Sequence, residues 1–357
     1  KINNQESLRI FEYDRILNTT WQIDFLLQEN SSNLWYHVTA RNLNKEEIPF
    51  YWWTNIAVPI NKNIRFLTPT EKAHGHSRDE LDSYPWPLEN NIDISYPERS
   101  NHVISLFYLS PKSTFPWFSY VDENGFGLFH GASSNFIGKK LFYFGNSQNG
   151  KTWMDTLSLP NQGNYIEIQA GITDSQLSTT KIKGNSILQW TACIGPIQCS
   201  ANLAHQADYN QAVNYVGQKL KENNLELEIE TVDKRMSTWY EITPDCILHE
   251  GEAWGGVYEK SSGTKIKGLL FTAPITAQEK PWYYLIVENN FPKDSLKSDP
   301  VSWNISDHWK QRIENSIAAG NQTWLHYLHL GVIALEVKDL SKAKENFIQS
   351  NQLKNNF

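Results

Sequence analysis

One short stretch of the sequence, GNYIEIQAGITDSQ at residues 163–176, places groups that could do chemistry at alternate positions. Successive side chains on a β-strand point to opposite faces, so Tyr165, Glu167 and Gln169 would share one face. A carboxylate partly shielded from water could move a proton, and the neighbouring amide could hold the carboxylate in position. The alternative is an ordinary strand glutamate that faces solvent or forms a salt bridge.

Histidines elsewhere in the chain could supply a matching acid. His130 in FGLFHGA lies between alternating apolar residues, so it could be a proton donor in a cleft or a hydrogen-bonded histidine in the core. His74 and His76 in KAHGHSRDE could contact a substrate. With Asp79 or Glu80 they could also bind a metal, although such a loop pair is more often solvated. We predict no metal site and no cofactor.

A glycoside hydrolase would need a second carboxylate, roughly 5 to 9.5 Å from the first. Asp155 in KTWMDTL is assigned this role, with Asp122, Glu123 and Glu252 as further candidates. Substrate contacts are expected from flat rings and polar groups, because sugar rings stack on aromatic faces, although most large aromatic residues fill cores. The residues assigned to substrate binding are Gln169, Tyr165, Trp53, Asn55, His74, His76, Trp153 and Lys140.

The segments that must position these residues alternate in the manner of strands. WQIDFLLQ, LWYHVTARN and FYWWTNIAVP follow one another between residues 21 and 60, separated by turn-forming Asn and Ser. Similar runs resume after an irregular Pro-rich stretch at residues 69–99 and continue to about residue 199. So many long strands predict two stacked antiparallel sheets. Residues 1–199 are therefore predicted to form one all-β domain.

Helical periodicity replaces this alternation in the next part of the chain. In ADYNQAVNYVGQKLKEN, Val213, Val216 and Leu220 fall on one face, which predicts an amphipathic helix packed on the sandwich. Short strands are expected farther on. We take residues 200–300 as a connecting region of mixed structure.

The last segment, residues 301–357, is predicted to form antiparallel helical hairpins. Leu330, Gly331, Ala343 and Phe347 have the offsets of a tetratricopeptide repeat, in which small residues let two helices pack closely. The alternative is a plain helical hairpin, because one repeat cannot bury its own hydrophobic face. A protein partner would bind the concave side of these helices. The side chains expected to face inward are those of Trp309, Ile313, Leu330, Ala343 and Phe347.

Composition limits the class of partner. With 14 Trp, 16 Tyr and 16 Phe, the 357-residue chain is aromatic for a soluble protein, which favours a sheet-rich fold or a surface that contacts carbohydrate. The net charge of −7 gives no basic field for phosphates, so nucleic acid is not an expected partner. No apolar run reaches the roughly 20 residues of a membrane helix. We expect a soluble protein, cytoplasmic or exported after removal of a signal.

Four stretches together resemble one bacterial family. They read FYWWTNIAVP, GKKLFYFGNSQNGKTW, YIEIQAGITDSQ and WLHYLHLGVIA, and the similarity extends over residues 20–350. In this order they are similar to the domain-of-unknown-function 5107 family, whose members join a galactose-mutarotase-like β-supersandwich to tetratricopeptide repeats. The resemblance implies this fold for the chain, with the β-supersandwich first and the helices last.

The resemblance also implies roles for single residues. Aldose epimerases of this superfamily place their catalytic base in a Glu-x-Gln strand, which would make Glu167 a general base. Their general acid is normally a histidine on the strand where this chain reads WWTNIAV, and Asn55 is the nearest polar residue there. Family members usually have a long β-rich segment before these strands, so the chain resembles a fragment, a processed product or a shortened relative. We expect another chain to cover the edge near the first strands.

These observations predict a carbohydrate-active protein that binds a saccharide. The first hypothesis is an enzyme of the glycoside hydrolase or epimerase type, with Glu167 as general acid/base and with His130 and Asp155 completing the catalytic set. The second is a noncatalytic carbohydrate-binding module whose repeats recruit a partner protein. The third is a scaffold in which the sandwich only supports the helices.

Overall fold

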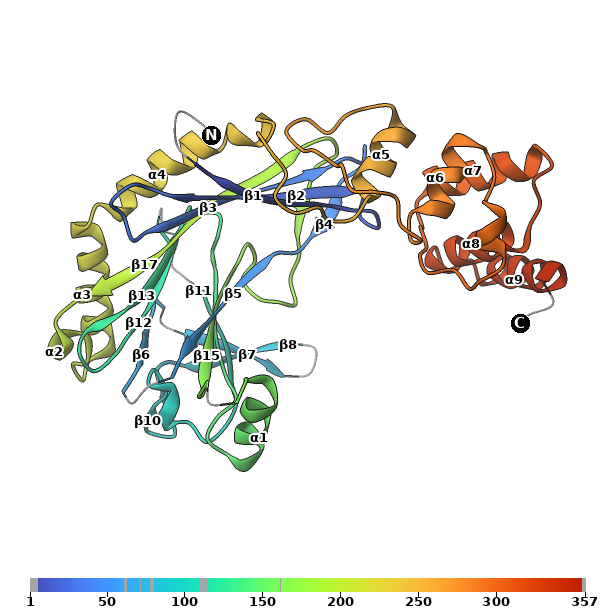
Figure 1. Ribbon diagram of the computed structural model, residues 1–357. Coiled ribbons are helices and arrows are strands. Elements are labelled where there is room, and N and C mark those ends of the chain that lie inside the picture. Colours follow the sequence, from blue (N-terminus) through green and yellow to red (C-terminus); the bar gives the residue numbers. More distant parts are fainter. Residues whose placement is uncertain are drawn as a thin grey trace. The chain divides into compact units, whose positions relative to one another are not determined.

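The computed structural model describes residues 6–60, 63–70, 72–77, 80–109, 115–160 and 162–354 (Figure 1). Contacts divide the chain into two compact units. Unit 1 consists of Lys1–Ile10, Ile23–Ala40 and Lys45–Tyr240. Unit 2 consists of Phe11–Gln22, Arg41–Asn44 and Glu241–Phe357. Each unit therefore combines segments that are distant in the sequence.

The larger sheet has seven strands in the order β1-β2-β3-β17-β13-β12-β6. Strand β13 pairs antiparallel with β17 on one side and with β12 on the other. Strand β1 lies at one edge, where Leu8 and Ile10 are exposed. The predicted covering of this edge by another chain stays a prediction. The strands are β1 (Leu8–Asp14), β2 (Thr19–Leu27), β3 (Leu34–Asn42), β17 (Ile187–Gln198), β13 (Phe126–Ala132), β12 (Trp117–Val121) and β6 (Arg65–Leu67).

The second sheet has six strands in the order β5-β15-β14-β11-β7-β8, and every neighbouring pair is antiparallel. Its strands are β5 (Trp53–Pro59), β15 (Tyr165–Gly171), β14 (Gly138–Tyr143), β11 (Ile104–Leu109), β7 (Lys72–Ser77) and β8 (Glu80–Pro85). Two short ribbons complete the strands: β4 (Ile48–Phe50) with β16 (Thr180–Ile182), and β9 (Leu88–Glu89) with β10 (Ile92–Asp93). The predicted antiparallel pairing is confirmed.

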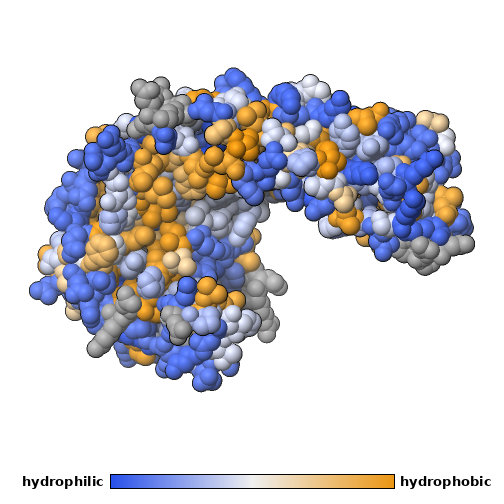
Figure 2. Space-filling view, in the orientation of Figure 1, coloured by the Kyte–Doolittle hydropathy of each residue, from blue (hydrophilic) through white to orange (hydrophobic). Residues whose placement is uncertain are grey.

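Apolar side chains from both sheets fill the space between them. The ring of Phe66 on β6 lies 5.2 Å from the ring of Tyr108 on β11, which joins the two layers directly. Ile166 and Ile168 on β15 are fully buried in the same cluster. In Figure 2 a band of hydrophobic residues lies over this part of unit 1. Burying each such side chain contributes about 1.5–3 kcal/mol, so the alternation of β15 fixes which of its faces turns inward.

Unit 1 also contains four α-helices in its described residues: α1 (Gln148–Leu157), α2 (Ala201–Ala204), α3 (Tyr209–Glu222) and α4 (Leu225–Met236). Helix α3 buries Val213, Val216 and Leu220, as the periodicity predicts. Helix α1 departs from the predicted all-β region, because the Ser147 hydroxyl accepts a hydrogen bond from the Gly150 amide and starts a helix there. The 3-10 turns of the chain are η1 (Pro97–Arg99), η2 (Trp239–Glu241) and η3 (Lys293–Leu296).

Unit 2 is mainly helical after residue 253. Its helices are α5 (Trp254–Ser262), α6 (Lys280–Val287), α7 (Asp307–Ala318), α8 (Trp324–Glu336) and α9 (Leu340–Lys354). Trp309, Ile313 and Ala343 are buried and Leu330 is half-buried, as predicted. A Cβ at Gly331 would lie 2.4 Å from the half-buried Phe347 ring, so the glycine lets α8 and α9 approach closely. None of the described helices has both the length and the apolar character needed to cross a membrane.

Candidate functional site

The outward face of the six-stranded sheet holds a row of polar and aromatic side chains. Residues directly opposite in an antiparallel pair share a face, and Asn55, Gln169, Lys140, Phe107 and His74 are successive partners across five strands. Their neighbours along each strand, such as the buried Ile168 of β15, turn toward the core. The predicted substrate residues from four separate segments therefore lie on one surface.

Four polar side chains form a continuous hydrogen-bonded chain on this outward face. The Lys140 ammonium donates to Gln176 Oε1 at 2.6 Å, and Gln176 Nε2 donates to Gln169 Oε1 at 2.8 Å. Gln169 Nε2 then donates to Glu167 Oε2 at 2.9 Å. A cation and a carboxylate are thus connected through two amides whose orientation is set by their partners. Glu167 is half-buried, which partly shields it from water.

Burial controls the protonation of the cation in this chain. It lowers the pKa of Lys140 to about 8, while the nearby Glu167 charge acts in the opposite direction. The ammonium also lies 4.9 Å from the centre of the Phe107 ring. The ring of the exposed His76 stacks on the same Phe107 ring, and the two ring centres are 5.0 Å apart. Burial and the Lys140 charge both lower the pKa of His76, so that it is mainly neutral near pH 7.

Trp53 provides an aromatic surface at one end of this face. A Cβ at Gly171 would lie 2.3 Å from the Trp53 ring, and one at Gly138 would lie 2.9 Å from it. The two glycines therefore let the indole lie directly against β15 and β14. The ring also makes an edge contact with Phe107 at 5.7 Å. Trp53 Nε1 is buried and has no hydrogen-bond partner among the described atoms.

Helix α1 places a second indole on the same side of unit 1. Phe142, on the outward face of β14, makes an edge contact with Phe144, whose ring stacks on Trp153 at 6.4 Å. Trp153 is 56% exposed. Asp155 is exposed on the same helix, and no contact in the described part of the chain joins it to Glu167. Tyr165 is half-buried at the start of β15, and burial followed by the Glu167 charge raises its pKa.

The expectation that His130 lies beside Glu167 is not met. His130 is fully buried on β13 of the other sheet, where its ring stacks 4.9 Å from Phe118 and its Nε2 lies 2.8 Å from the Tyr36 hydroxyl. Glu167 points away from that core, so the six-stranded sheet separates the two side chains. Burial and the Lys139 charge lower the pKa of His130 well below its usual value. His130 is therefore a hydrogen-bonded histidine of the core, which is the second of the two alternatives predicted from the sequence.

The His74–His76 pair lies on β7, with both side chains on the outward face. Asp79 lies outside the described residues, as does the side chain of Glu80. Among the residues that the structure describes, no group of three His, Cys, Asp or Glu side chains could hold a metal ion.

Sequence reasoning did not assign roles to Gln176, Phe107 or Phe142. Gln176 ends the stretch that contains Glu167, but it follows the strand, so alternation could not predict where it points. Phe107 and Phe142 occur in long apolar runs in which the outward and inward aromatic residues look alike. Only the register between strands shows that they lie beside Lys140 and Glu167.

Residues 5–203 match the family described as Domain of unknown function (DUF5107), which is more than half of the chain. The chain belongs to the DUF5107 family. The match covers both sheets of the sandwich, and thus the whole outward face described above. No curated protein matches the sequence.

Several solved structures are similar to this DUF5107 protein. A TPR-domain containing protein from Parabacteroides distasonis has 16% identity and a TM-score of 0.52, over 96% of this chain and 58% of that chain. A galactose mutarotase-like protein from Clostridium acetobutylicum has 12% identity and a TM-score of 0.38, over 51% of this chain and 56% of that chain. Another from Lactobacillus casei has 8% identity and a TM-score of 0.39, over 55% of this chain and 72% of that chain. The DUF5107 chain spans less than two thirds of the length of the Parabacteroides protein. The predicted fold class, antiparallel sheets followed by helices, is confirmed.

Proposed function

We propose that the outward face of the six-stranded sheet binds a saccharide and that Glu167 and Lys140 exchange protons with it. The supporting observation is the hydrogen-bonded chain from the Lys140 ammonium through two amides to the Glu167 carboxylate, with Trp53 and Phe107 beside it. The reaction class that fits this pair is aldose epimerisation at the anomeric carbon.

The two residues have complementary roles in this proposal. Glu167 removes the proton of the anomeric hydroxyl, and the Lys140 ammonium donates a proton to the ring oxygen, so the C1–O5 bond breaks and a carbonyl forms at C1. After rotation about C1–C2, the reverse transfers close the ring with the opposite configuration and restore both residues. Gln169 orients the carboxylate, and burial lowers the pKa of Lys140 to about 8, close to the pH at which an acid is most effective.

A hydrolase with two carboxylates is the weaker proposal. Such an enzyme needs a second Asp or Glu facing the same bond. Among the described side chains that the register assigns to this face, Glu167 is the only carboxylate. Asp155, the predicted second carboxylate, is exposed on α1.

A noncatalytic carbohydrate-binding module is the alternative function. One observation favours it: Asn55, which the resemblance aligns with the epimerase acid, has no proton to give at neutral pH. The amides of Gln169 and Gln176 could then contact sugar hydroxyl groups without any reaction. In this alternative the helices of unit 2 would recruit a protein partner.

Glu167→Gln tests these proposals, because the change nearly preserves shape and removes the basic oxygen. In polarimetry with freshly dissolved α-anomers of neutral aldoses, we expect the rate of interconversion to fall by a factor of about 10² or more. Calorimetry with the same sugars should show that affinity is largely retained. The control is Glu230→Gln, which changes an exposed glutamate of α4 in the same unit.

Each outcome separates two hypotheses. Saccharide binding without catalysis by the unchanged protein would support the binding module and reject the enzyme. Catalysis that survives Glu167→Gln would remove Glu167 from the mechanism. If no saccharide in a broad panel binds, both carbohydrate proposals fail and the scaffold hypothesis remains.

A further inference from the structure

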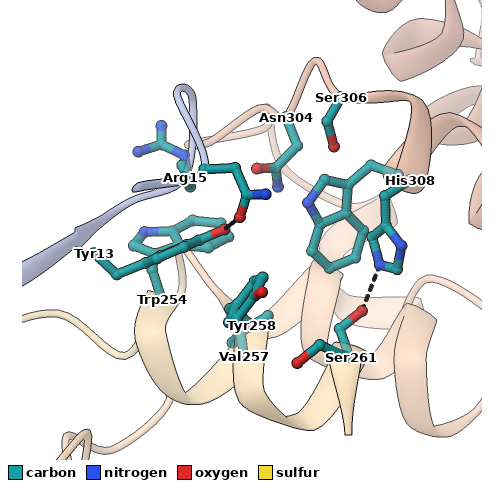
Figure 3. A pocket seen from close by; sticks show the side chains of 12 residues that line it. Tyr13, Arg15, Trp254, Val257, Tyr258, Ser261, Asn304, Ser306 and His308 are labelled. Carbon is teal, nitrogen blue, oxygen red and sulfur yellow. Dashed lines mark hydrogen bonds between the residues drawn. The ribbon is translucent and has the colours of Figure 1, made fainter. Parts of the chain in front are cut away.

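Unit 2 contains a cavity that the proposed function of the sheet does not use (Figure 3). Its volume is about 230 Å³, and all of its lining residues belong to unit 2. The walls come from three parts of the chain: the end of β1 with the turn that follows it, helix α5, and the first turn of α7 with the loop before it. Aromatic side chains form much of the wall, and the largest of these are Tyr13, Trp254, Tyr258 and Trp309.

Asn304 is the most unusual residue of this lining. Its side chain is fully buried, and neither Oδ1 nor Nδ2 has a hydrogen-bond partner among the described atoms. Figure 3 shows the carboxamide pointing into the space bounded by Tyr13, Tyr258 and His308. Nε1 of Trp254, in the same lining, is also buried without a described partner. Figure 3 shows this nitrogen turned away from Asn304, so the donor and the acceptor that face the cavity are those of the Asn304 carboxamide.

Unpartnered polar groups destabilise a folded protein, because they lose their hydrogen bonds to water and gain none in return. Native proteins keep few of them, and a cluster of two around one cavity needs an explanation. The neighbouring polar groups of this cavity are satisfied, since the Tyr13 hydroxyl donates to Asn18 Oδ1 at 3.0 Å and Ser261 Oγ lies 2.5 Å from His308 Nε2. In this lining the buried groups without a described partner belong to Asn304 and Trp254, and the Asn304 carboxamide is the one that faces the space where a ligand could pair with it.

The charges of the lining restrict the class of ligand. Among the described residues that line the cavity none is a carboxylate, so the lining offers no counter-charge to a cation. Burial and the Arg312 charge lower the pKa of His308, which keeps it mainly neutral near pH 7. Burial raises the pKa of Tyr13, which keeps its hydroxyl protonated. The one formal charge is on Arg15, whose guanidinium lies 4.8 Å from the Trp254 ring and donates to the Trp303 carbonyl.

The size of the cavity and its hydrogen-bonding groups restrict the class of ligand further. A cavity of about 150 Å³ holds benzene, so 230 Å³ has room for one six-membered ring with several substituents. A hydroxyl group both donates and accepts, and so it can pair with Asn304 Oδ1 and Nδ2. The C–H faces of a sugar ring pack on aromatic rings such as Tyr13 and Trp309.

We propose that this cavity binds one uncharged sugar unit, as a monosaccharide or as the end of a longer glycan. The Asn304 carboxamide holds its hydroxyl groups, and the aromatic walls contact its ring. The site is independent of the outward sheet face, so the protein has a second place for a saccharide whether or not Glu167 acts as a base.

The substitution Asn304→Leu tests the proposal because it has opposite effects on binding and stability. It keeps the approximate shape of the side chain and removes the groups that pair with the ligand. With neutral monosaccharides and their methyl glycosides as probes, tryptophan fluorescence and calorimetry should show saturable binding to the full chain. The affinity at this site should fall at least tenfold in Asn304→Leu, whereas the melting temperature of the free protein should stay the same or rise, because an unpaired buried amide has been removed.

Three further variants complete the experiment. Trp254→Phe keeps a flat ring in the wall and removes an N–H group that is turned away from Asn304, so we expect little change in affinity. Asn315→Leu changes an exposed asparagine of α7 and should leave the binding unchanged. Trp53→Leu, which removes an aromatic ring from the outward sheet face, should also leave the binding at this cavity unchanged and thus distinguishes the two sites.

The proposal is overturned if no neutral sugar binds at millimolar concentration, or if Asn304→Leu lowers the melting temperature and leaves sugar affinity intact. Adenosine and benzamide serve as planar, uncharged probes of similar size. Their saturable binding, lost in Asn304→Leu in the absence of any sugar binding, would show a site for planar amides or bases and would reject the sugar class.

Discussion

Lys139 and Lys140 are adjacent on β14, yet the sheet separates their surroundings completely. Lys139 points into the core, where its ammonium donates to the Phe136 carbonyl at 2.9 Å and lies near the rings of Phe118 and Phe136. Lys140 points outward and begins the chain of hydrogen bonds that ends at Glu167. Burial lowers the pKa of both, to about 7 for Lys139 and to about 8 for Lys140.

The two lysines show that a lowered lysine pKa can arise in two different surroundings in this protein. For Lys139 it reflects a charge surrounded by apolar rings, which weakens the folded state and reaches no surface where a substrate could bind. For Lys140 it accompanies a hydrogen-bonded carboxylate and a row of aromatic residues on one face. In the proposed function, the second lysine is the one that donates a proton to the saccharide. The following changes test this contrast, from the largest expected effect to the smallest.

Lys139→Met should stabilise the protein at acid pH. The fall of the pKa from 10.5 to about 7 corresponds to a penalty of about 5 kcal/mol for the fully buried ammonium at pH 6. Between pH 7 and 10.5 the unfolded lysine binds a proton that the folded one has lost, so the wild-type free energy of unfolding rises with pH in that window. The gain from Lys139→Met should therefore be up to about 5 kcal/mol at pH 6 and should vanish near pH 10.5.

Urea denaturation at pH 6, 8 and 10 measures this dependence. Lys140→Met serves as the comparison and should change stability much less, because Lys140 has a polar partner and the Glu167 charge nearby. A lower free energy of unfolding for Lys139→Met at pH 6 would show that the buried ammonium stabilises the core.

Lys140→Met should remove the acid from the proposed reaction. We expect the rate of epimerisation to fall by a factor of about 10². In the wild-type protein the rate should also decline as the pH rises through about 8, because Lys140 then loses the proton that it donates. That decline should be absent from Lys140→Met and should move to higher pH in Lys140→Arg. An unchanged decline in both variants would assign it to another group.

Gln176→Leu should have the smallest effect of the three. It interrupts the chain between Lys140 and Gln169, so the amide that orients Glu167 loses one of its two partners. We expect about a tenfold loss of rate, and fluorescence titration should show nearly unchanged sugar affinity. Gln218→Leu, at an exposed position of α3, is the matched control. A rate equal to that of the wild type would show that the chain does not position Glu167.

Alternation and helical periodicity predicted most of the fold, because the spacing of apolar residues along the sequence shows which side chains of a strand or helix are buried. The strand around Glu167 and the helix that buries Val213, Val216 and Leu220 are examples. Helix α1 was missed because its short sequence contains no sustained apolar face, and a single capping hydrogen bond at Ser147 starts it.

The site was only partly predictable, for a different physical reason. Alternation placed Tyr165, Glu167 and Gln169 on one face, but pairing between strands decides which other residues join them. His130 occurs in an alternating strand much as Glu167 does, and only the stacking of the two sheets buries it against Phe118. Asn304 carried no sequence signal at all, because its unpaired amide depends on side chains from distant segments.

Unit 2 combines segments that are far apart in the sequence, and this affects how the unit folds during synthesis. Tyr13, Asn18 and the rest of the Phe11–Gln22 ribbon leave the ribosome about 240 residues before Trp254 and later partners are synthesised. At roughly 5–20 residues per second this interval lasts on the order of 10–50 seconds. During that time the aromatic residues of the ribbon have no helical partners to cover them. A chaperone that binds exposed aromatic segments of nascent chains would therefore have time to bind this ribbon, and release would follow once helices α5, α6 and α7 emerge.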